Sequence, residues 1–343
     1  MKKLLAVLLV AIMALGLVAC GNEPAPTEAP APAATEAPAP AATEAPAATE
    51  APEEKTFLIG MSQCNLGEPW RVAMNNQIAA AAEAYPQFEV VFSDAAQDNA
   101  KQVADVENFI TQGVDLLIIS PNEAAPLTDV VAKAYDAGIP VIVLDRKVEG
   151  DKYTQFIGGD NVMIGKKAGE YVANYLGEEG GTIVEIRGLD GSTPAQERHD
   201  GFVEGLGSNP NIEIVYSQSC DWLRDKAITV MEAALQAVDH IDVVYGHNDP
   251  AAIAAYIAAE NAGRADEMIY LGIDGLPDPD GGIQDVIAGR QTVTYVYPTG
   301  GAEAIESAYQ ILVEGKDVEK TITLDTIEIT AENAEEMLAK FGG

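Results

Sequence analysis

From residue 56 onward, the sequence alternates short runs rich in valine and isoleucine with longer amphipathic stretches. The short runs are typical of strands that are buried on both faces. In the stretch 162–176, Ile164, Ala168 and Val172 recur at helical spacing, and Asp160 is a predicted N-cap. Repeated strand-helix-strand units predict an α/β architecture of parallel sheets with helices on both faces. The predicted strands are 57–61, 88–92, 116–119, 141–144, 182–186, 212–216, 243–245, 269–272 and 293–296.

The size and composition of this region narrow the architecture further. One core rarely holds so many residues, so we expect two such domains. Aromatic residues make up only 6% of the chain while 48% is hydrophobic, so the core must consist mainly of alanine, valine, isoleucine and leucine. Three cysteines cannot form a disulfide framework, and His199, His240 and His247 match no zinc spacing. We therefore expect a fold held by apolar packing, without structural metal.

The charge balance argues against some partners. Aspartate and glutamate number 54 against 20 lysines and arginines, which gives a formal net charge of -34. A surface this acidic repels phosphate backbones and anionic lipid. Binding to nucleic acid, or to a membrane surface by charge, is therefore not expected.

The N-terminal segment resembles a bacterial lipoprotein signal peptide followed by a tether. Two lysines precede an apolar run over 4–18, which falls short of the roughly 20 residues of a membrane span. The run ends in Leu-Val-Ala before Cys20, so we expect residues 1–19 to be removed and a lipid to be attached to the cysteine sulfur. A plain secretory signal is the alternative. Residues 20–55 are rich in Thr-Glu-Ala-Pro and Ala-Pro-Ala-Ala units, which favour an extended tether. The rest of the chain is then anchored outside the cytoplasmic membrane.

Polar and aromatic residues gather where the predicted strands end. In open parallel sheets, ligands bind beyond the carboxyl ends of the strands. Both tryptophans of the chain, Trp70 and Trp222, follow predicted strands. Taken singly, such residues could be core fillers, surface ion pairs or helix caps, but together the loops indicate one binding site. These loops are 62–71, 145–146, 187–198, 221–222, 247–249 and 274–275.

The chemistry of these loops suits a sugar. Aromatic faces stack on the C–H faces of a pyranose or furanose, whereas aspartate, asparagine and arginine serve hydroxyls that both donate and accept. A glycosidase is the enzymatic alternative, with Glu68, Asp145 and Asp274 as available carboxylates. No residue stands out as a nucleophile, no Gly-x-Ser-x-Gly elbow is present, and 159–167 departs from the phosphate-loop pattern. The sequence therefore favours binding without catalysis and without a cofactor.

Over essentially all of 56–343, the chain resembles the type I periplasmic binding proteins of sugar ABC transporters, the ribose-binding and galactofuranose-binding group. After the first strand these proteins often carry Asn-Pro-Phe-Phe, whereas Glu-Pro-Trp-Arg stands here at 68–71, which is closer to the galactofuranose-binding branch. The resemblance implies a monosaccharide, in pentose, hexose or furanose form, as the ligand and a permease as the partner. The matching stretches are Val-Ile-Val-Leu-Asp-Arg at 141–146, Gly-Asp-Asn at 159–161, Gln-Glu-Arg-His-Asp-Gly-Phe at 196–202, Gly-His-Asn-Asp at 246–249 and Gly-Ile-Asp-Gly at 272–275.

The same resemblance implies roles for individual residues. Trp70 and Trp222 would stack on the sugar, and charged or amide side chains would hydrogen-bond it. Val296 stands where ribose-binding members carry a glutamine, so one contact is either lost or replaced by Tyr297. The ligand-binding residues that follow are Glu68, Trp70, Arg71, Asp145, Arg146, Arg198, Trp222, Asn248, Asp274 and Tyr297.

The resemblance also implies two doubly wound lobes joined by a three-stranded hinge that closes around the ligand. Lobe one would be 56–158 plus 297–325, and lobe two 159–296 plus 326–343. The protein is expected to act as a monomer. Cys64 and Cys220 follow strands of different lobes, and a bridge between them would oppose opening, so we expect free thiols. A ligand-binding protein that serves a chemoreceptor or sensor kinase is the alternative function.

Overall fold

The computed structural model describes residues 55–342, which fall in one structural unit. The predicted signal peptide, Cys20 and all but the last residue of the predicted tether lie outside the described residues. Within 55–342, no helix is both long enough and apolar enough to cross a membrane.

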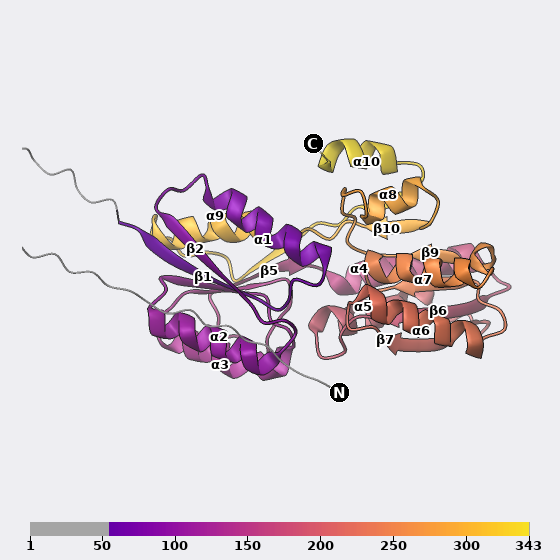
Figure 1. Ribbon diagram of the computed structural model, residues 1–343, viewed down its shortest axis with the longest axis horizontal. Coiled ribbons are helices and arrows are strands. Elements are labelled where there is room, and N and C mark those ends of the chain that lie inside the picture. The colour runs from indigo at the N-terminus through magenta and orange to yellow at the C-terminus, as the bar shows by residue number, and fades with distance from the viewer. Residues whose placement is uncertain (1–54, 343) are drawn as a thin grey trace, which may run out of the picture. The chain divides into compact units, whose positions relative to one another are not determined.

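A first sheet of six strands, parallel throughout, is built mainly from the N-terminal half of the described chain (Figure 1). Its central strands β3 and β4 are entirely buried, as their all-aliphatic sequences predict. We call the part of the molecule built on this sheet lobe one. In spatial order the strands are β11 (Thr321–Leu324), β5 (Gln155–Gly159), β4 (Val141–Leu144), β3 (Leu116–Ile119), β1 (Phe57–Gln63) and β2 (Phe88–Asp94).

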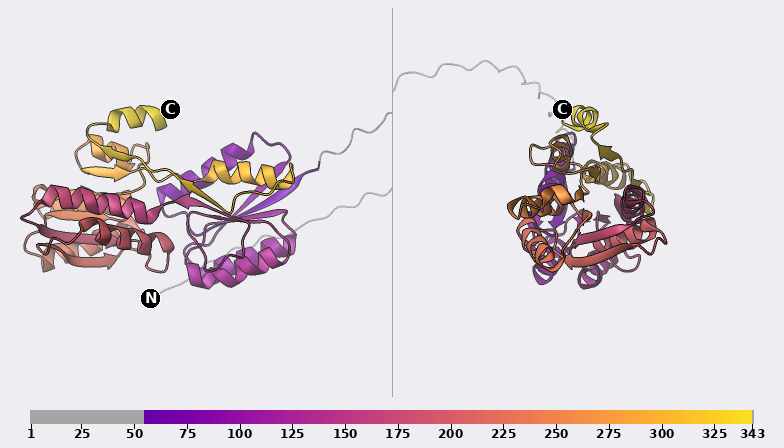
Figure 2. Two further views of the ribbon diagram at one scale, coloured as in Figure 1. Left: turned by 180° about the vertical axis from the view of Figure 1, so that it is seen from behind. Right: turned by 90° about the vertical axis from the view of Figure 1, so that its right-hand side faces the viewer.

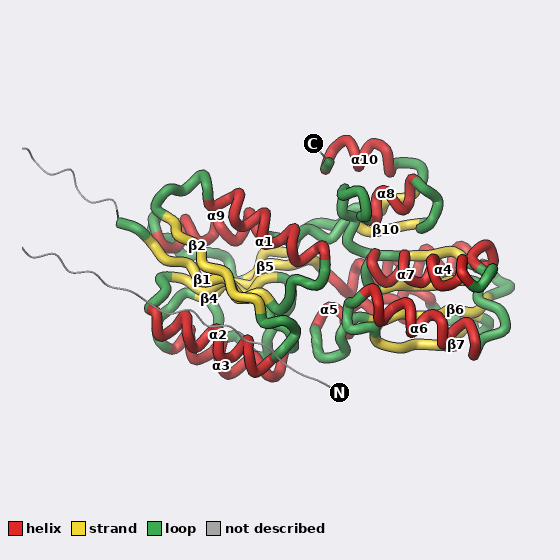
Figure 3. The backbone as a smooth tube through the Cα atoms, viewed as in Figure 1, coloured by secondary structure: helices red, strands yellow, loops and turns green. Residues whose placement is uncertain are grey.

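Helices cover both faces of the first sheet (Figure 3). Alternate residues of β3 point to opposite faces, so Leu116 and Ile118 pack in one core cluster and Leu117 and Ile119 in another. The first cluster includes residues of α1 (Pro69–Ala82) and α9 (Gly301–Leu312), and the second includes residues of α2 (Asn99–Gln112) and α3 (Ala124–Asp136).

A second sheet of six strands repeats this order, and we call the part built on it lobe two. Only its edge strand β12 runs antiparallel to its neighbour. In each sheet the spatial order of the strands reverses beside the strand that comes first in the sequence, which is β1 in lobe one and β6 in lobe two. In sheets of this kind the ligand crevice lies at that point of reversal. The strands are β12 (Glu328–Thr330), β10 (Val293–Tyr295), β9 (Ile269–Leu271), β8 (Val243–Gly246), β6 (Gly181–Arg187) and β7 (Ile212–Ser219).

The helices of lobe two also lie on both sheet faces. Seen from behind in Figure 2, α4 runs along the face opposite to α6 and α7. The predicted N-cap of α4 is confirmed, because the Asp160 carboxylate accepts a hydrogen bond of 2.9 Å from the Met163 amide. The helices are α4 (Asn161–Leu176), α5 (Thr193–Leu206), α6 (Arg224–Ala237), α7 (Asp249–Asn261), α8 (Gly282–Ile287) and α10 (Ala334–Phe341), with a 3-10 turn at Ala265–Glu267.

Helices α4 and α5 touch through their backbones. A Cβ atom on Gly201 of α5 would overlap the carbonyl oxygen of Val162, and one on Gly169 of α4 would overlap that of Phe202. The glycines therefore let two helices approach more closely than side chains would allow. Because α5 carries Arg198, this contact fixes a predicted site residue relative to α4.

The predicted α/β fold of two doubly wound sheets is confirmed, and the chain passes between the sheets three times. The passages follow β5, β10 and β11, close to the predicted boundaries at 158, 296 and 325, which stay a prediction. Cys64 and Cys220 are buried free thiols, and burial raises the pKa of Cys220 to about 12.

Candidate ligand-binding site

Side chains from both lobes and from the hinge surround a cavity at the carboxyl ends of the strands. Its volume is about 20 Å³, little more than one water molecule needs. A sugar can therefore enter only when the lobes or the lining side chains move apart. The lining residues are Glu68, Trp70, Arg71, Asp145, Pro194, Arg198, Trp222, Asn248, Asp274 and Tyr297.

All the predicted ligand-binding residues line this cavity except Arg146. Arg146 is buried beside it, where Nη1 donates to the Asn122 carbonyl at 2.8 Å and the guanidinium lies 5.6 Å from the centre of the Trp222 ring. Pro194, in the first turn of α5, also lines the cavity and was not predicted. A proline in the first turn of a helix gives no sign of ligand chemistry.

Trp70 lies in the first turn of α1 and is held firmly in place. Its indole Nε1 donates to the backbone carbonyl of Tyr297 at 2.7 Å, and the two rings stack with centroids 5.2 Å apart. The guanidinium of Arg71 lies 4.8 Å from the centre of the indole ring. Trp70 therefore presents a fixed apolar face, at low entropic cost for a ligand that packs on it.

Lobe one contributes a buried cluster of two carboxylates and two guanidinium groups. Arg71 Nη1 lies 2.7 Å from Asp145 Oδ2, and one Glu68 oxygen lies 3.8 Å from both Arg71 and Arg146. Burial alone would raise the pKa of Asp145, but the charges of Arg71 and Arg146 lower it below its usual value. The four charges balance, so this wall suits a neutral polar ligand better than an ion.

Tyr297 lies in the segment that leads from β10 back to lobe one, and it links the two walls of the cavity. Its hydroxyl donates to Asp145 Oδ1 at 2.7 Å and accepts from Asn161 Nδ2 at 3.1 Å. A side chain at Gly159 would overlap the Tyr297 ring, so glycine is required there. Burial raises the pKa of Tyr297, which keeps the phenol protonated. The sequence alone does not reveal a role for Asn161, because its hydrogen-bond partners come from distant parts of the chain.

Lobe two places Arg198 beneath two aromatic rings. Nε donates to Asn161 Oδ1 at 2.9 Å, and Nη1 donates to the backbone carbonyl of His247. The guanidinium lies 5.3 Å from the centre of the Trp222 ring and 4.6 Å from that of the Tyr297 ring. Arg198 is thus fixed by hydrogen bonds and by stacking before any ligand binds.

Asn248 and Asp274 complete the lobe-two wall. Asn248 is also the N-cap of α7, since its Oδ1 accepts from the Ala251 amide at 3.0 Å, while its Nδ2 donates to the Trp222 carbonyl at 3.2 Å. Asp274 has a positive φ of 142°, a strained backbone often found at binding sites. Burial, reinforced by the charge of Asp249, raises the pKa of Asp274 well above its usual value.

Three groups of direct contacts join the lobes without involving a lining residue of the cavity. The side-chain Nε2 of Gln97 donates to the backbone carbonyl of Asp221 at 2.9 Å, and both residues have positive φ angles. The other contacts are Ala124 N to the Gly191 carbonyl at 3.1 Å, Lys147 N to Thr193 Oγ1 at 3.0 Å, and Lys147 Nζ to Glu197 Oε1 at 2.5 Å.

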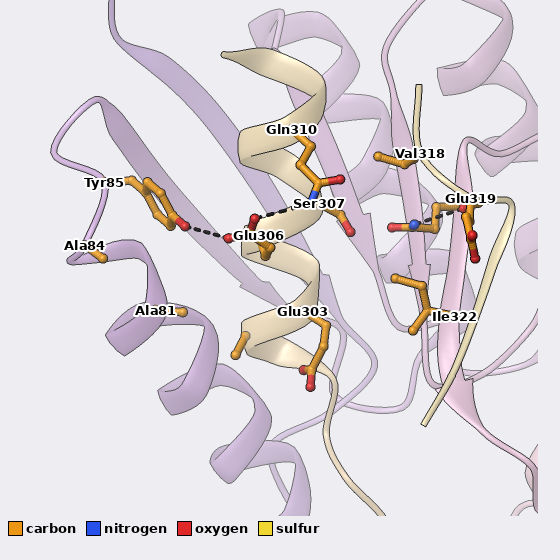
Figure 4. A pocket seen from close by; sticks show the side chains of 12 residues that line it. Ala81, Ala84, Tyr85, Glu303, Glu306, Ser307, Gln310, Val318, Glu319 and Ile322 are labelled. Carbon is orange, nitrogen blue, oxygen red and sulfur yellow. Dashed lines mark hydrogen bonds between the residues drawn. The ribbon is translucent and has the colours of Figure 1, made fainter. Parts of the chain in front are cut away.

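A larger groove of about 570 Å³ lies elsewhere on lobe one, between α1, α9 and β11 (Figure 4). One of its carboxylates, that of Glu306, already accepts hydrogen bonds from neighbouring side chains: Tyr85 donates to it at 2.7 Å and Gln310 at 3.2 Å. None of the predicted ligand-binding residues lines it, and it contains no tryptophan. We therefore take the smaller cavity between the lobes as the candidate site.

Comparison with known proteins agrees with this fold. Residues 59–317 match the model of the periplasmic binding protein domain. The chain is 32% identical to the ribose import binding protein of Bacillus subtilis over 323 residues, which cover 94% of this chain and 97% of that protein. Among solved structures, the fructose-binding periplasmic domain of a hybrid two-component system is 43% identical, with a TM-score of 0.80 over 83% of this chain and 94% of that one. A Mycobacterium smegmatis protein in complex with β-D-fucofuranose is 32% identical, with a TM-score of 0.78 over 83% and 94%. The chain therefore belongs to the periplasmic binding protein family.

Proposed function

We propose that this chain is the extracytoplasmic substrate-binding lipoprotein of a sugar ABC transporter, and that it binds a neutral monosaccharide between its lobes. The observation that carries the proposal is the pairing of Trp70 and Trp222 with a charge-balanced set of hydrogen-bonding groups around one cavity. The lobes separate to admit the sugar and close on it, and the closed form is what the permease recognises. The protein acts as a monomer with lobes bounded as the resemblance implies.

A furanose form of the sugar is favoured among the pentoses and hexoses that the site chemistry allows. A similar protein was solved with β-D-fucofuranose, and another is described as binding fructose. The stretch Glu68 to Arg71 points to the same branch by resemblance.

The alternative is a sugar sensor that signals to a receptor or kinase. The observation in its favour is the likeness to a binding domain from a hybrid two-component system. Deleting the gene separates the two functions. Loss of labelled sugar uptake supports transport, whereas normal uptake with a lost transcriptional response supports sensing.

Binding without chemical change is the first expected result. A thermal-shift screen of residues 56–343 against pentoses, hexoses and furanose-containing sugars should identify a ligand, because a ligand at 100 times its dissociation constant adds about 2.7 kcal/mol of stability. Mass spectrometry of that sugar after incubation should recover it unaltered. A modified product would mean that the protein is an enzyme, such as a glycosidase.

Membrane anchoring through Cys20 is the second expected result. Replacing Cys20 by serine removes the sulfur that would carry the lipid, so the protein should be released from the membrane or remain an unprocessed precursor. Cell fractionation and gel mobility measure both outcomes. Cys64→Ser, which alters a cysteine buried in the fold, is the control and should stay anchored. If Cys20→Ser is processed and anchored like the parent, the lipoprotein assignment is wrong.

A further inference from the structure

A buried carboxylate lies beneath the lobe-two wall and has no place in the proposed contacts with sugar. Glu185, on β6, has no exposed surface, and no lysine or arginine pairs with it among the described residues. Its Oε1 accepts from His199 Nδ1 at 2.9 Å and from His247 Nε2 at 3.0 Å, and its Oε2 accepts from Ser217 Oγ at 2.6 Å. Burial alone would raise the pKa of Glu185, but these hydrogen bonds from His199, His247 and Ser217 lower it below its usual value.

The two histidines play different parts. His199 is partly exposed, and its hydrogen bond to Glu185 raises its pKa. His247 is fully buried, and burial lowers its pKa, so its ring is neutral. Because a carboxylate only accepts, the proton of the neutral ring lies on Nε2. Within residues 55–342, Nδ1 of His247 has no hydrogen-bond partner, so the bond to Glu185 is the ring's single polar anchor.

His247 in turn contacts the cavity wall. Its backbone carbonyl accepts from Arg198 Nη1. Its ring lies 6.3 Å from the Trp222 ring, centre to centre, and the next residue is Asn248. His247 therefore adjoins three lining residues, although it does not line the cavity itself.

We propose that Glu185 is a positioning residue of the sugar site: by anchoring the His247 ring, it fixes the carbonyl that orients Arg198 and the support beneath Trp222. It acts through His247 and does not touch the ligand. The effect on sugar affinity rests on the proposed function, but the effect on Trp222 does not.

Glu185→Ala should weaken binding of the best sugar from the thermal-shift screen by at least tenfold, as measured by calorimetric titration on folded protein. The matched control is Ser217→Ala, which removes a bond to the same carboxylate but leaves the His247 contact in place. It should lower thermal stability yet keep affinity within about twofold, since it does not free the His247 ring. If Glu185→Ala loses stability but binds like the parent, Glu185 merely supports the fold and the proposal fails.

A second measurement needs no ligand. In a Trp70→Phe background, Trp222 is the only tryptophan, so its emission reports on the lobe-two wall alone. Glu185→Ala should shift that emission without sugar, and Ser217→Ala should not. An unchanged spectrum overturns the proposal. If no sugar binds the parent protein, the proposed function fails while this arm still decides the positioning role.

A conservative variant covers the case in which Glu185→Ala does not fold. Glu185→Gln keeps the volume and can still accept from His247, but through a neutral and weaker hydrogen bond. It should reduce sugar affinity by about threefold and shift the Trp222 emission in the same direction. Parental affinity together with a parental spectrum in Glu185→Gln would contradict the proposal.

Discussion

Replacing Trp70 by alanine should weaken every sugar that the protein binds by about 100-fold or more. Truncating a buried aromatic side chain costs on the order of 3 kcal/mol or more in lost contact and burial. Trp70 is 3% exposed, stacks on Tyr297 and is held by a hydrogen bond to its carbonyl, so nothing nearby can take over its face. Because stacking does not depend on which hydroxyl points where, the loss should be similar for all bound sugars.

Asp274→Ala is the matched comparison for this prediction. Removing its carboxyl leaves sugar hydroxyls unpaired in a dry cavity, which costs roughly 1–3 kcal/mol and depends on stereochemistry. The ranking of two epimeric sugars should therefore change in Asp274→Ala but not in Trp70→Ala. Calorimetric titration of both variants against both epimers measures this. If neither variant loses even about tenfold in affinity, or 1.4 kcal/mol, these residues do not form the site.

Gly201→Ala should lower the free energy of unfolding by about 2–3 kcal/mol. In an ordinary helix the same change stabilises by up to about 1 kcal/mol. Here the added methyl would overlap the Val162 carbonyl, so α4 and α5 would have to separate along their whole contact. Urea unfolding of residues 56–343 measures the loss.

Glu170→Ala is the control for the glycine contact, because Glu170 lies exposed on α4. Its unfolding free energy should stay within about 0.5 kcal/mol of the parent. If Gly201→Ala proves as stable as Glu170→Ala, then the two helices can adjust and the backbone contact does not matter for stability.

Most strands could be predicted from their apolar, β-branched runs, including the edge strands β2 and β7, whereas three strands beside the passages between the lobes could not. Each of the nine runs predicted as a strand contains a strand. Short apolar, β-branched runs such as those of β3 and β4 are stable only where both faces of a strand are buried. The missed strands are β5, β11 and β12. β5 carries two glycines, β11 has only four residues of which two are exposed, and β12 has three residues. In these cases pairing partners, not local pattern, decide the structure.

The loops of the candidate site followed from the rule that loops at the carboxyl ends of parallel strands converge, and the roles of individual residues followed from the resemblance to sugar-binding proteins. This rule brought together loops from both lobes that are far apart in the sequence. It could not identify Asn161 or Glu185, because their importance comes from hydrogen bonds to residues that lie beside the site. It also could not show that Arg146 lies behind the cavity wall, since orientation within a loop depends on the packing around it.

The direct contacts between the lobes have a kinetic consequence. The bonds of Gln97 to Asp221, of Ala124 to Gly191 and of Lys147 to Thr193 are the same whichever sugar occupies the cavity. They must break before the lobes can separate and a sugar can leave. The free-energy cost of breaking these contacts therefore contributes equally to the residence time of every ligand. The residues of the cavity determine which sugar is selected, whereas the contacts between the lobes outside the cavity contribute to the rate of release. A permease that separates the lobes would have to break these contacts first.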